Sequence, residues 1–256
     1  GLNVWVTTNG YVLFYVSNSD AWSDHVYRNK GLLELGRVRV KLSPPLPVGQ
    51  NFSQALKLAD GAVEIHAGAA DSPVTLRVWV DANRPLVHVE TEAPQPDTVS
   101  VAFETLRPSP DKDIHADTIL TNATNRVIWY YRNENQHVPE LTGLTFGAAI
   151  SGDDLVSTDP TDLRSTKPAR RHVITLCALT AQTPSGQAWL HQLNTLASRT
   201  EAVPPAAAWR EHGNWWRDFW NRSWIFVSGD ADARRVTEGY VLQRFVTACA
   251  GRGAYP

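Results

Sequence analysis

The strongest constraint on the fold is a series of short segments in which apolar and polar residues alternate, repeated from residue 1 to about residue 180. A period of two places the apolar side chains on one face of a β-strand. Turn residues separate the segments, and Asn9-Gly10 is the pair that type I′ hairpins prefer. The segments indicate at least ten strands, more than an immunoglobulin-type domain holds. We therefore predict a mainly β fold, an antiparallel two-sheet super-sandwich.

The pattern becomes helical near residue 186. "GQAWLHQLNTLASRTEA" has apolar residues at helical spacing, and the stretch after Pro205 holds five of the ten tryptophans. Its rings form one helix face, which could stack on sugar or pack between domains, and we favour packing. The residues expected in this interdomain contact are Trp209, His212, Trp216, Phe219 and Trp220. "SWIFVSG" then predicts a strand, and a helix is expected from Asp232 to Ala250.

Composition excludes several classes of function. The net charge is −2, with 43% hydrophobic and 20% charged residues, so neither nucleic acid nor an anionic membrane is expected as a partner. No apolar run approaches the ~20 residues of a membrane helix. The absence of methionine predicts an internal piece of a longer protein.

Motifs for catalysis and for cofactor binding are not found. The sequence has no GxSxG, HExxH or CxxC, and its eight histidines show no ligand spacing, so we expect no cofactor, no metal and no catalytic residue. The stretch "YYRNENQHVPE" predicts a polar loop that could contact sugar hydroxyls, although a surface loop without a ligand is preferred. "SGDDLVSTDPTDLRSTKPARR" predicts another extended loop.

Both ends of the chain resemble a known family. "WWRDFWNRSWIFVSG", "VTEGYVLQRFVTACAGRGAYP" and the opening "GLNVWVTTNGYVLFYVSNSDAWSD" are similar to the N-terminal region of bacterial domain of unknown function 5703 proteins. Those proteins resemble glycoside hydrolase family 95 and other six-hairpin glycosidases. Between residues 50 and 185 only the strand pattern agrees, and the glycine-rich "GNG" loop of the family would lie before Gly1.

The resemblance implies a division of the chain into three parts. These are a β super-sandwich (1–185), a tryptophan-rich helical linker (186–228) and the start of a truncated (α/α)6 barrel (229–256). The paired carboxylates of such enzymes belong to the barrel. By position in the family, the expected substrate-binding residues of this chain are Asp20, Trp22, Ser23, Arg252 and Tyr255. A turn at the end of a strand is the alternative for the first three.

The expected function follows from this division. The chain would be a non-catalytic domain that braces the helical barrel and lends loops to a carbohydrate-binding cleft of a secreted or periplasmic protein. Its partners would be an oligo- or polysaccharide and the barrel itself. The alternative is a lectin-like carbohydrate-binding module without catalysis. A third possibility is a parent protein whose barrel has lost its activity.

Overall fold

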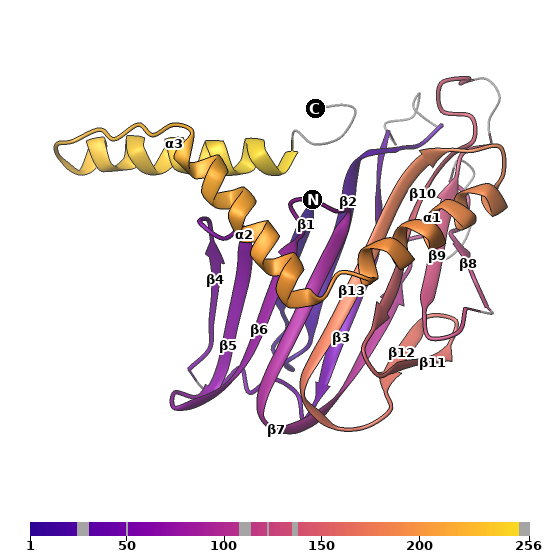
Figure 1. The fold of residues 1–256 in the computed structure, drawn as a ribbon, viewed down its shortest axis with the longest axis horizontal. Helices are drawn as coiled ribbons and strands as arrows, with labels where there is room; N and C mark the ends of the chain where they lie inside the picture. The colour runs from indigo at the N-terminus through magenta and orange to yellow at the C-terminus, as the bar shows by residue number, and fades with distance from the viewer. Residues whose placement is uncertain (25–30, 50, 108–113, 122, 135–137, 251–256) are drawn as a thin grey trace.

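The computed structural model describes residues 1–24, 31–49, 51–107, 114–121, 123–134 and 138–250, and it is mainly β (Figure 1). Its strands are β1 (Leu2–Val6), β2 (Val12–Trp22), β3 (Leu32–Ser43), β4 (Ser53–Lys57), β5 (Ala62–Ala69), β6 (Ser72–Val80), β7 (Leu86–Glu104), β8 (Thr118–Ile119), β9 (Val127–Arg132), β10 (Leu144–Gly152), β11 (Leu155–Asp159), β12 (Asp162–Ser165) and β13 (Ala169–Gln182). Its helices are α1 (Gly186–Glu201), α2 (Pro205–Asn221) and α3 (Ala231–Ala250).

The strands form two antiparallel layers that share β7. We call the layer β1-β2-β3-β7-β12-β11 sheet A and the layer β4-β5-β6-β7-β13-β10-β9-β8 sheet B. The first half of β7 pairs with β6 and β13, and its second half pairs with β3 and β12. A strand of 19 residues is long enough to pass from one layer into the other. The predicted super-sandwich is therefore confirmed.

The core lies between the inner faces of the two sheets. Along the second half of β7, Val99, Val101 and Phe103 point inward and are buried. Phe103 stacks on Trp129 of β9 with ring centroids 4.0 Å apart. The indole N–H of Trp129 donates to the carbonyl of Leu35 at 2.7 Å, so this buried polar group is satisfied.

Two local predictions are wrong. The β1–β2 hairpin forms, but Thr7 pairs with Tyr11 and only Gly10, not Asn9, has a positive φ, so the turn is not type I′. The segment predicted as an extended loop holds the β11–β12 hairpin. Leu155 and Leu163 are its buried anchors, too few to produce a visible alternation.

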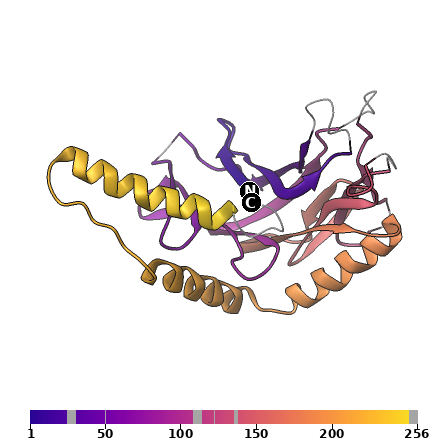
Figure 2. The ribbon, with the colours of Figure 1, turned by 90° about the horizontal axis from the view of Figure 1, so that it is seen from above.

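Helices α1 and α2 both pack on the outer face of sheet B (Figure 2), whereas the sequence predicted an interdomain contact for the tryptophan face of α2. Ser185 caps α1 by accepting from the N–H of Ala188 at 3.1 Å, and Pro205 begins α2. The helix expected from Asp232 to Ala250 is confirmed as α3, but none of its residues is buried. In the described part of the chain, no helix combines the length and the apolar character that a membrane crossing requires.

The strand predicted for "SWIFVSG" is wrong. Residues 223–228 follow α2 without regular secondary structure, although their composition favours a strand. A strand needs a neighbour to accept its backbone hydrogen bonds, and this segment leads away from both sheets toward α3 (Figure 1).

Candidate functional site

The inner face of α2 is fixed to the turn between β4 and β5. The indole N–H of Trp220 donates to the carbonyl of Leu58 at 3.0 Å, and Nε2 of His212 lies 2.7 Å from the carbonyl of Asp60. Trp216 lies directly over Gly61, where an added Cβ would be 2.0 Å from the indole nitrogen. Helix and turn therefore fit as one packed and hydrogen-bonded unit.

His212 is held in one protonation state by its two backbone partners. Its Nδ1 accepts from the N–H of Ala82 at 3.1 Å, and a carbonyl such as that of Asp60 can only accept, so Nε2 carries the proton. The ring is fully buried between α2 and sheet B. Burial lowers the pKa of His212 below its ordinary value. The histidine is thus a neutral bridge between helix and sheet.

Charged groups surround this bridge. Arg84 contacts both Asp81, at 3.0 Å, and Glu211 of α2. His88 stacks on Trp79 with ring centroids 3.9 Å apart and lies 3.7 Å from Asp81. Burial would raise the pKa of Asp81, but the nearby His88 ring and the hydrogen bonds from the Asn83 backbone and Arg84 outweigh it and lower that pKa. These contacts tie the polar side of α2 to the same sheet.

The remaining rings predicted to pack between domains lie at the two ends of α2. Trp209 meets Trp79 edge to face at 5.2 Å and lies under the guanidinium of Arg77 at 4.5 Å. Phe219 lies on the side facing α3, where Arg244 is 4.7 Å from its ring centroid and donates to its carbonyl at 2.9 Å. Much of the tryptophan face is thus covered by sheet B. Its contact with a barrel stays a prediction.

The segment after α2 exposes apolar side chains. Phe226 is 75% exposed and Val246 of α3 is 57% exposed, although both are strongly apolar. Trp224, Ile225, Val227, Val236 and Leu242 are exposed as well. Phe245 stacks on Trp216 at 5.1 Å, and with Arg244 it holds α3 beside α2. We call the exposed residues of 224–227 and α3 the apolar strap.

A cavity of about 710 Å³ opens between α2, the β4–β5 turn and the apolar strap. Indole rings and polar groups line it together: Leu58, Ala59, Asp60, Trp209, Arg210, Gly213, Asn214, Arg217, Trp220, Asn221, Trp224 and Val241. Among the described residues, none lies within 4 Å of a Cβ added at Gly213. This residue lacks any packing reason to be glycine, which costs ~0.5–1 kcal/mol in a helix, and it keeps part of the cavity open.

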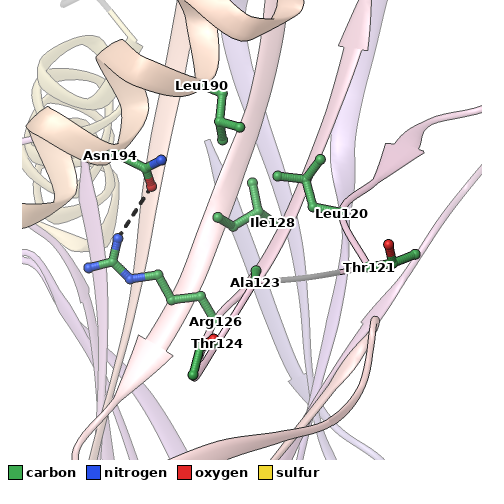
Figure 3. A pocket seen from close by; sticks show the side chains of 8 residues that line it. All are labelled: Leu120, Thr121, Ala123, Thr124, Arg126, Ile128, Leu190 and Asn194. Atoms are coloured by element: carbon green, nitrogen blue, oxygen red, sulfur yellow. Dashed lines mark hydrogen bonds between the residues drawn. The ribbon is translucent and has the colours of Figure 1, made fainter.

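A second cavity, of about 480 Å³, lies between α1 and the edge of sheet B at β8 and β9 (Figure 3). Leu120, Ile128 and Leu190 form its apolar part, and Arg126 extends toward Asn194 on its polar part. The guanidinium of Arg126 also contacts Glu201, so its charge is already balanced within the chain. This arrangement offers little specific chemistry for a ligand.

Three of the predicted substrate-binding residues, Asp20, Trp22 and Ser23, lie near the point where β2 and β9 end. Trp22 is 38% exposed, while Ser23 is fully buried and donates its N–H to Gly31. Asn133 joins the two strand ends, since its amide donates to the Trp22 carbonyl at 2.7 Å and its oxygen accepts from the N–H of Asp24 at 3.1 Å. Asn133 therefore fixes the end of β2 that carries the predicted substrate-binding residues, and nothing in the sequence indicated this contact.

Besides Trp22 and Ser23, the predicted substrate-binding residues are Asp20, Arg252 and Tyr255. Asp20 lies inside β2, where the pairing with β3 is irregular, and its backbone N–H donates to the side chain of Asn18 at 3.1 Å. Arg252 and Tyr255 lie outside the described residues. Within the described part of the chain, no three His, Cys, Asp or Glu residues approach closely enough to hold a metal ion.

These features define a class of protein: a β super-sandwich domain with a helical linker fixed on one of its sheets. The chain belongs to the domain of unknown function 5703 family, whose N-terminal model matches residues 1–225. No curated protein matches the sequence at a significant level.

Solved structures share the fold. A putative kojibiose phosphorylase from human microbiome aligns with a TM-score of 0.53 at 8% identity. The alignment covers 94% of this chain but only 35% of that protein, so the chain spans about a third of its length. At this identity the likeness establishes the fold alone.

Proposed function

We propose that this chain is the non-catalytic N-terminal β domain of a carbohydrate-active protein, in which it braces a helical domain and lends loops to a carbohydrate-binding cleft. The single observation that carries this proposal is the apolar strap, which follows directly on the firmly anchored α2. The solved phosphorylase, in which the shared fold makes up 35% of the chain, supports a carbohydrate-active parent.

The energetics favour a partner for the strap. Full burial of one large apolar side chain contributes about 1.5–3 kcal/mol. Phe226 and Val246 together would thus contribute several kcal/mol on docking, whereas the described chain leaves both in water. In this proposal α2 acts as the fixed side of the joint, because its polar groups already bond to the β4–β5 turn.

The test uses the native gene beyond the codon for Pro256. Its translated continuation is expressed as a separate polypeptide and mixed with the 256-residue chain. We expect the two to co-elute in size-exclusion chromatography, and Phe226→Asp to abolish the complex. The matched control is Leu56→Asp, which changes an exposed apolar residue of β4 outside the strap. A complex that survives Phe226→Asp, or no complex at all, would refute bracing through the strap.

A second candidate is a lectin-like module that binds carbohydrate in the α2 cavity. The observation in its favour is the combination of Trp209 and Trp224 with the amides of Asn214 and Asn221 around one opening. Aromatic faces and amide groups are suited to sugar rings and their hydroxyls. A volume of about 710 Å³ is in the range of small-molecule sites.

Intrinsic tryptophan fluorescence separates the two candidates. A module should show quenching by soluble cello- or malto-oligosaccharides, and Gly213→Leu should remove it by filling the open space above the helix. Gly213→Ala fills far less and is the matched control. Quenching that Gly213→Leu leaves unchanged would exclude this cavity as the sugar site.

A further inference from the structure

The outer face of sheet A carries aromatic and cationic side chains in register across its strands. Tyr15 is paired with Arg37, and Arg37 is paired with Glu104 on the next strand. Two residues along, the pairing runs from Trp5 through Leu13, Arg39 and Ala102 to Asp162. The rows follow from the strand pairing itself, so the groups are held by the most rigid part of the fold.

These side chains point away from the core. Alternate residues of the same strands, such as Phe14, Val38 and Val101, belong to the core cluster between the sheets. Neighbouring residues of a strand lie on opposite faces, so Tyr15, Arg37 and Ala102 face outward. Both α1 and α2 pack on sheet B, on the opposite side of the molecule (Figure 2).

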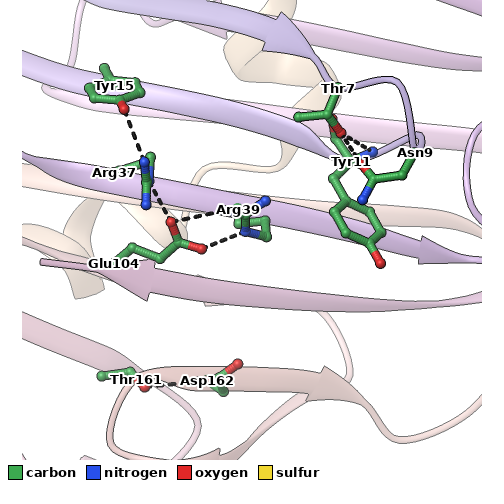
Figure 4. A network of polar contacts seen from close by, with 9 residues as sticks. All are labelled: Thr7, Asn9, Tyr11, Tyr15, Arg37, Arg39, Glu104, Thr161 and Asp162. Carbon is green, nitrogen blue, oxygen red and sulfur yellow. Dashed lines mark hydrogen bonds and ion pairs between the residues drawn. The ribbon is translucent and has the colours of Figure 1, made fainter.

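Rings and cations lie side by side on this face, and Figure 4 shows Tyr15, Arg37, Glu104 and Arg39 joined by a hydrogen bond and two ion pairs. Trp5 stacks on Tyr15 at 4.7 Å, and the guanidinium of Arg37 lies 5.7 Å from the Tyr15 ring centroid. In the row beyond Arg39, the ammonium of Lys41 lies 4.9 Å from the centroid of the Tyr11 ring. Trp5 remains 40% exposed at the edge of the sheet. The face thus offers ring surface and positive charge side by side.

Positive charge exceeds negative charge on this face. Glu104 is shared between Arg37 and Arg39, so one carboxylate serves two guanidinium groups. Lys41 and the exposed Arg164 add two cations, against two further carboxylates in the same rows, those of Asp162 and of Asp159, which is paired with Asp162. Four cations against three carboxylates leave an excess of one positive charge, on a chain whose net charge is −2.

We propose that this outer face of sheet A is a binding platform for an acidic polysaccharide that carries carboxylates along a chain of pyranose rings. Guanidinium groups bind carboxylates in a two-pronged geometry, and tryptophan and tyrosine rings stack on the apolar faces of sugars. The choice of a glycan over other polyanions rests on the proposed carbohydrate-related function.

A substitution of Glu104 tests the proposal, because removing this carboxylate should strengthen the binding of an acidic polysaccharide. Glu104→Gln releases Arg37 and Arg39 from their shared carboxylate, so polygalacturonate should bind up to about fivefold more tightly to this variant, because a partly exposed ion pair contributes up to about 1 kcal/mol. Lys41→Gln should weaken binding by a similar factor, and no ion pair involving Lys41 is seen in the described residues. Affinity is measured by titration calorimetry on the 256-residue chain, with neutral dextran as the uncharged probe.

The matched control is Arg171→Gln, which removes one positive charge from the outer face of sheet B, where Arg171 pairs with Glu90. It should leave the affinity for polygalacturonate unchanged. Equal weakening by Arg171→Gln, no gain with Glu104→Gln, or no binding of polygalacturonate overturns the proposal. Binding of oligothymidylate as tight as that of polygalacturonate also overturns it, in favour of a general polyanion surface. The strap variant Phe226→Asp should not alter this affinity, so the platform and the bracing role can fail separately.

Discussion

Gly61→Ala is the sharpest perturbation of the joint between α2 and the sandwich. Gly61 has φ of +59°, a conformation that costs an L-residue roughly 1–2 kcal/mol. Its new Cβ would also lie 2.0 Å from Nε1 of Trp216, so the indole must move. A tryptophan buries on the order of 150–250 Å², which at ~25 cal/mol per Å² amounts to ~4–6 kcal/mol if the ring leaves entirely. Partial movement of the ring predicts a total loss of about 2–4 kcal/mol.

Urea denaturation followed by tryptophan fluorescence measures this loss, and hydrogen exchange of the α2 amides locates it. The matched control is Gly213→Ala in the middle of α2, where an added Cβ meets none of the described residues within 4 Å. That substitution should stabilise the chain by ~0.5–1 kcal/mol, because alanine is the better helix former. If Gly61→Ala costs less than about 1 kcal/mol, Trp216 does not depend on this turn and the packing argument fails.

Two further predictions concern buried polar groups. The pKa of His212 is below its ordinary value in the folded state, so the unfolded chain takes up the proton first and stability should fall as the pH drops from about 6.5 toward 5. His212→Gln should lower stability at pH 7 and reduce this pH dependence in urea denaturation; an unchanged slope would exclude His212 as its source. Arg107→Met should cost ~3–5 kcal/mol, because it leaves the buried Asp117 carboxylate without its partner at 2.7 Å. The exposed Arg235–Asp232 pair is the control, and Arg235→Met should change stability by less than ~1 kcal/mol.

The sheets could be predicted from the sequence because alternation is a local signal. Each strand of sheet A that the pattern located has core residues at every second position, such as Val99, Val101 and Phe103 of β7. The sharing of β7 between the two layers was not visible, since a long alternating run looks the same whether its partners change or not. Likewise, the β11–β12 hairpin escaped prediction because only Leu155 and Leu163 are buried in it.

The failure at "SWIFVSG" has a different physical cause. Isoleucine, phenylalanine and valine favour extended backbone, and residues 223–228 are indeed not helical. Whether such a segment becomes a strand depends on a neighbouring edge with free N–H and C=O groups, and composition carries no information about that edge. The prediction of the substrate-binding residues had the same limit. Sequence placed Trp22 and Ser23 at a strand end, but only the fold shows that Asn133, over a hundred residues away, holds that end in place.

Helix α2 shows what can be inferred from a periodic pattern and what cannot. Spacing of three and four placed His212, Trp216 and Trp220 on one face, which the structure bears out, since all three are buried. A pattern cannot name what covers that face, and here it is the turn at Asp60-Gly61 on sheet B. Glycine suits this turn for a local reason as well, the freedom of its backbone to adopt a positive φ. Gly61 is therefore required for two reasons, a positive φ and the close approach of the Trp216 indole, some 155 positions along the chain. Only the positive φ can be inferred from the residues next to Gly61 in the sequence.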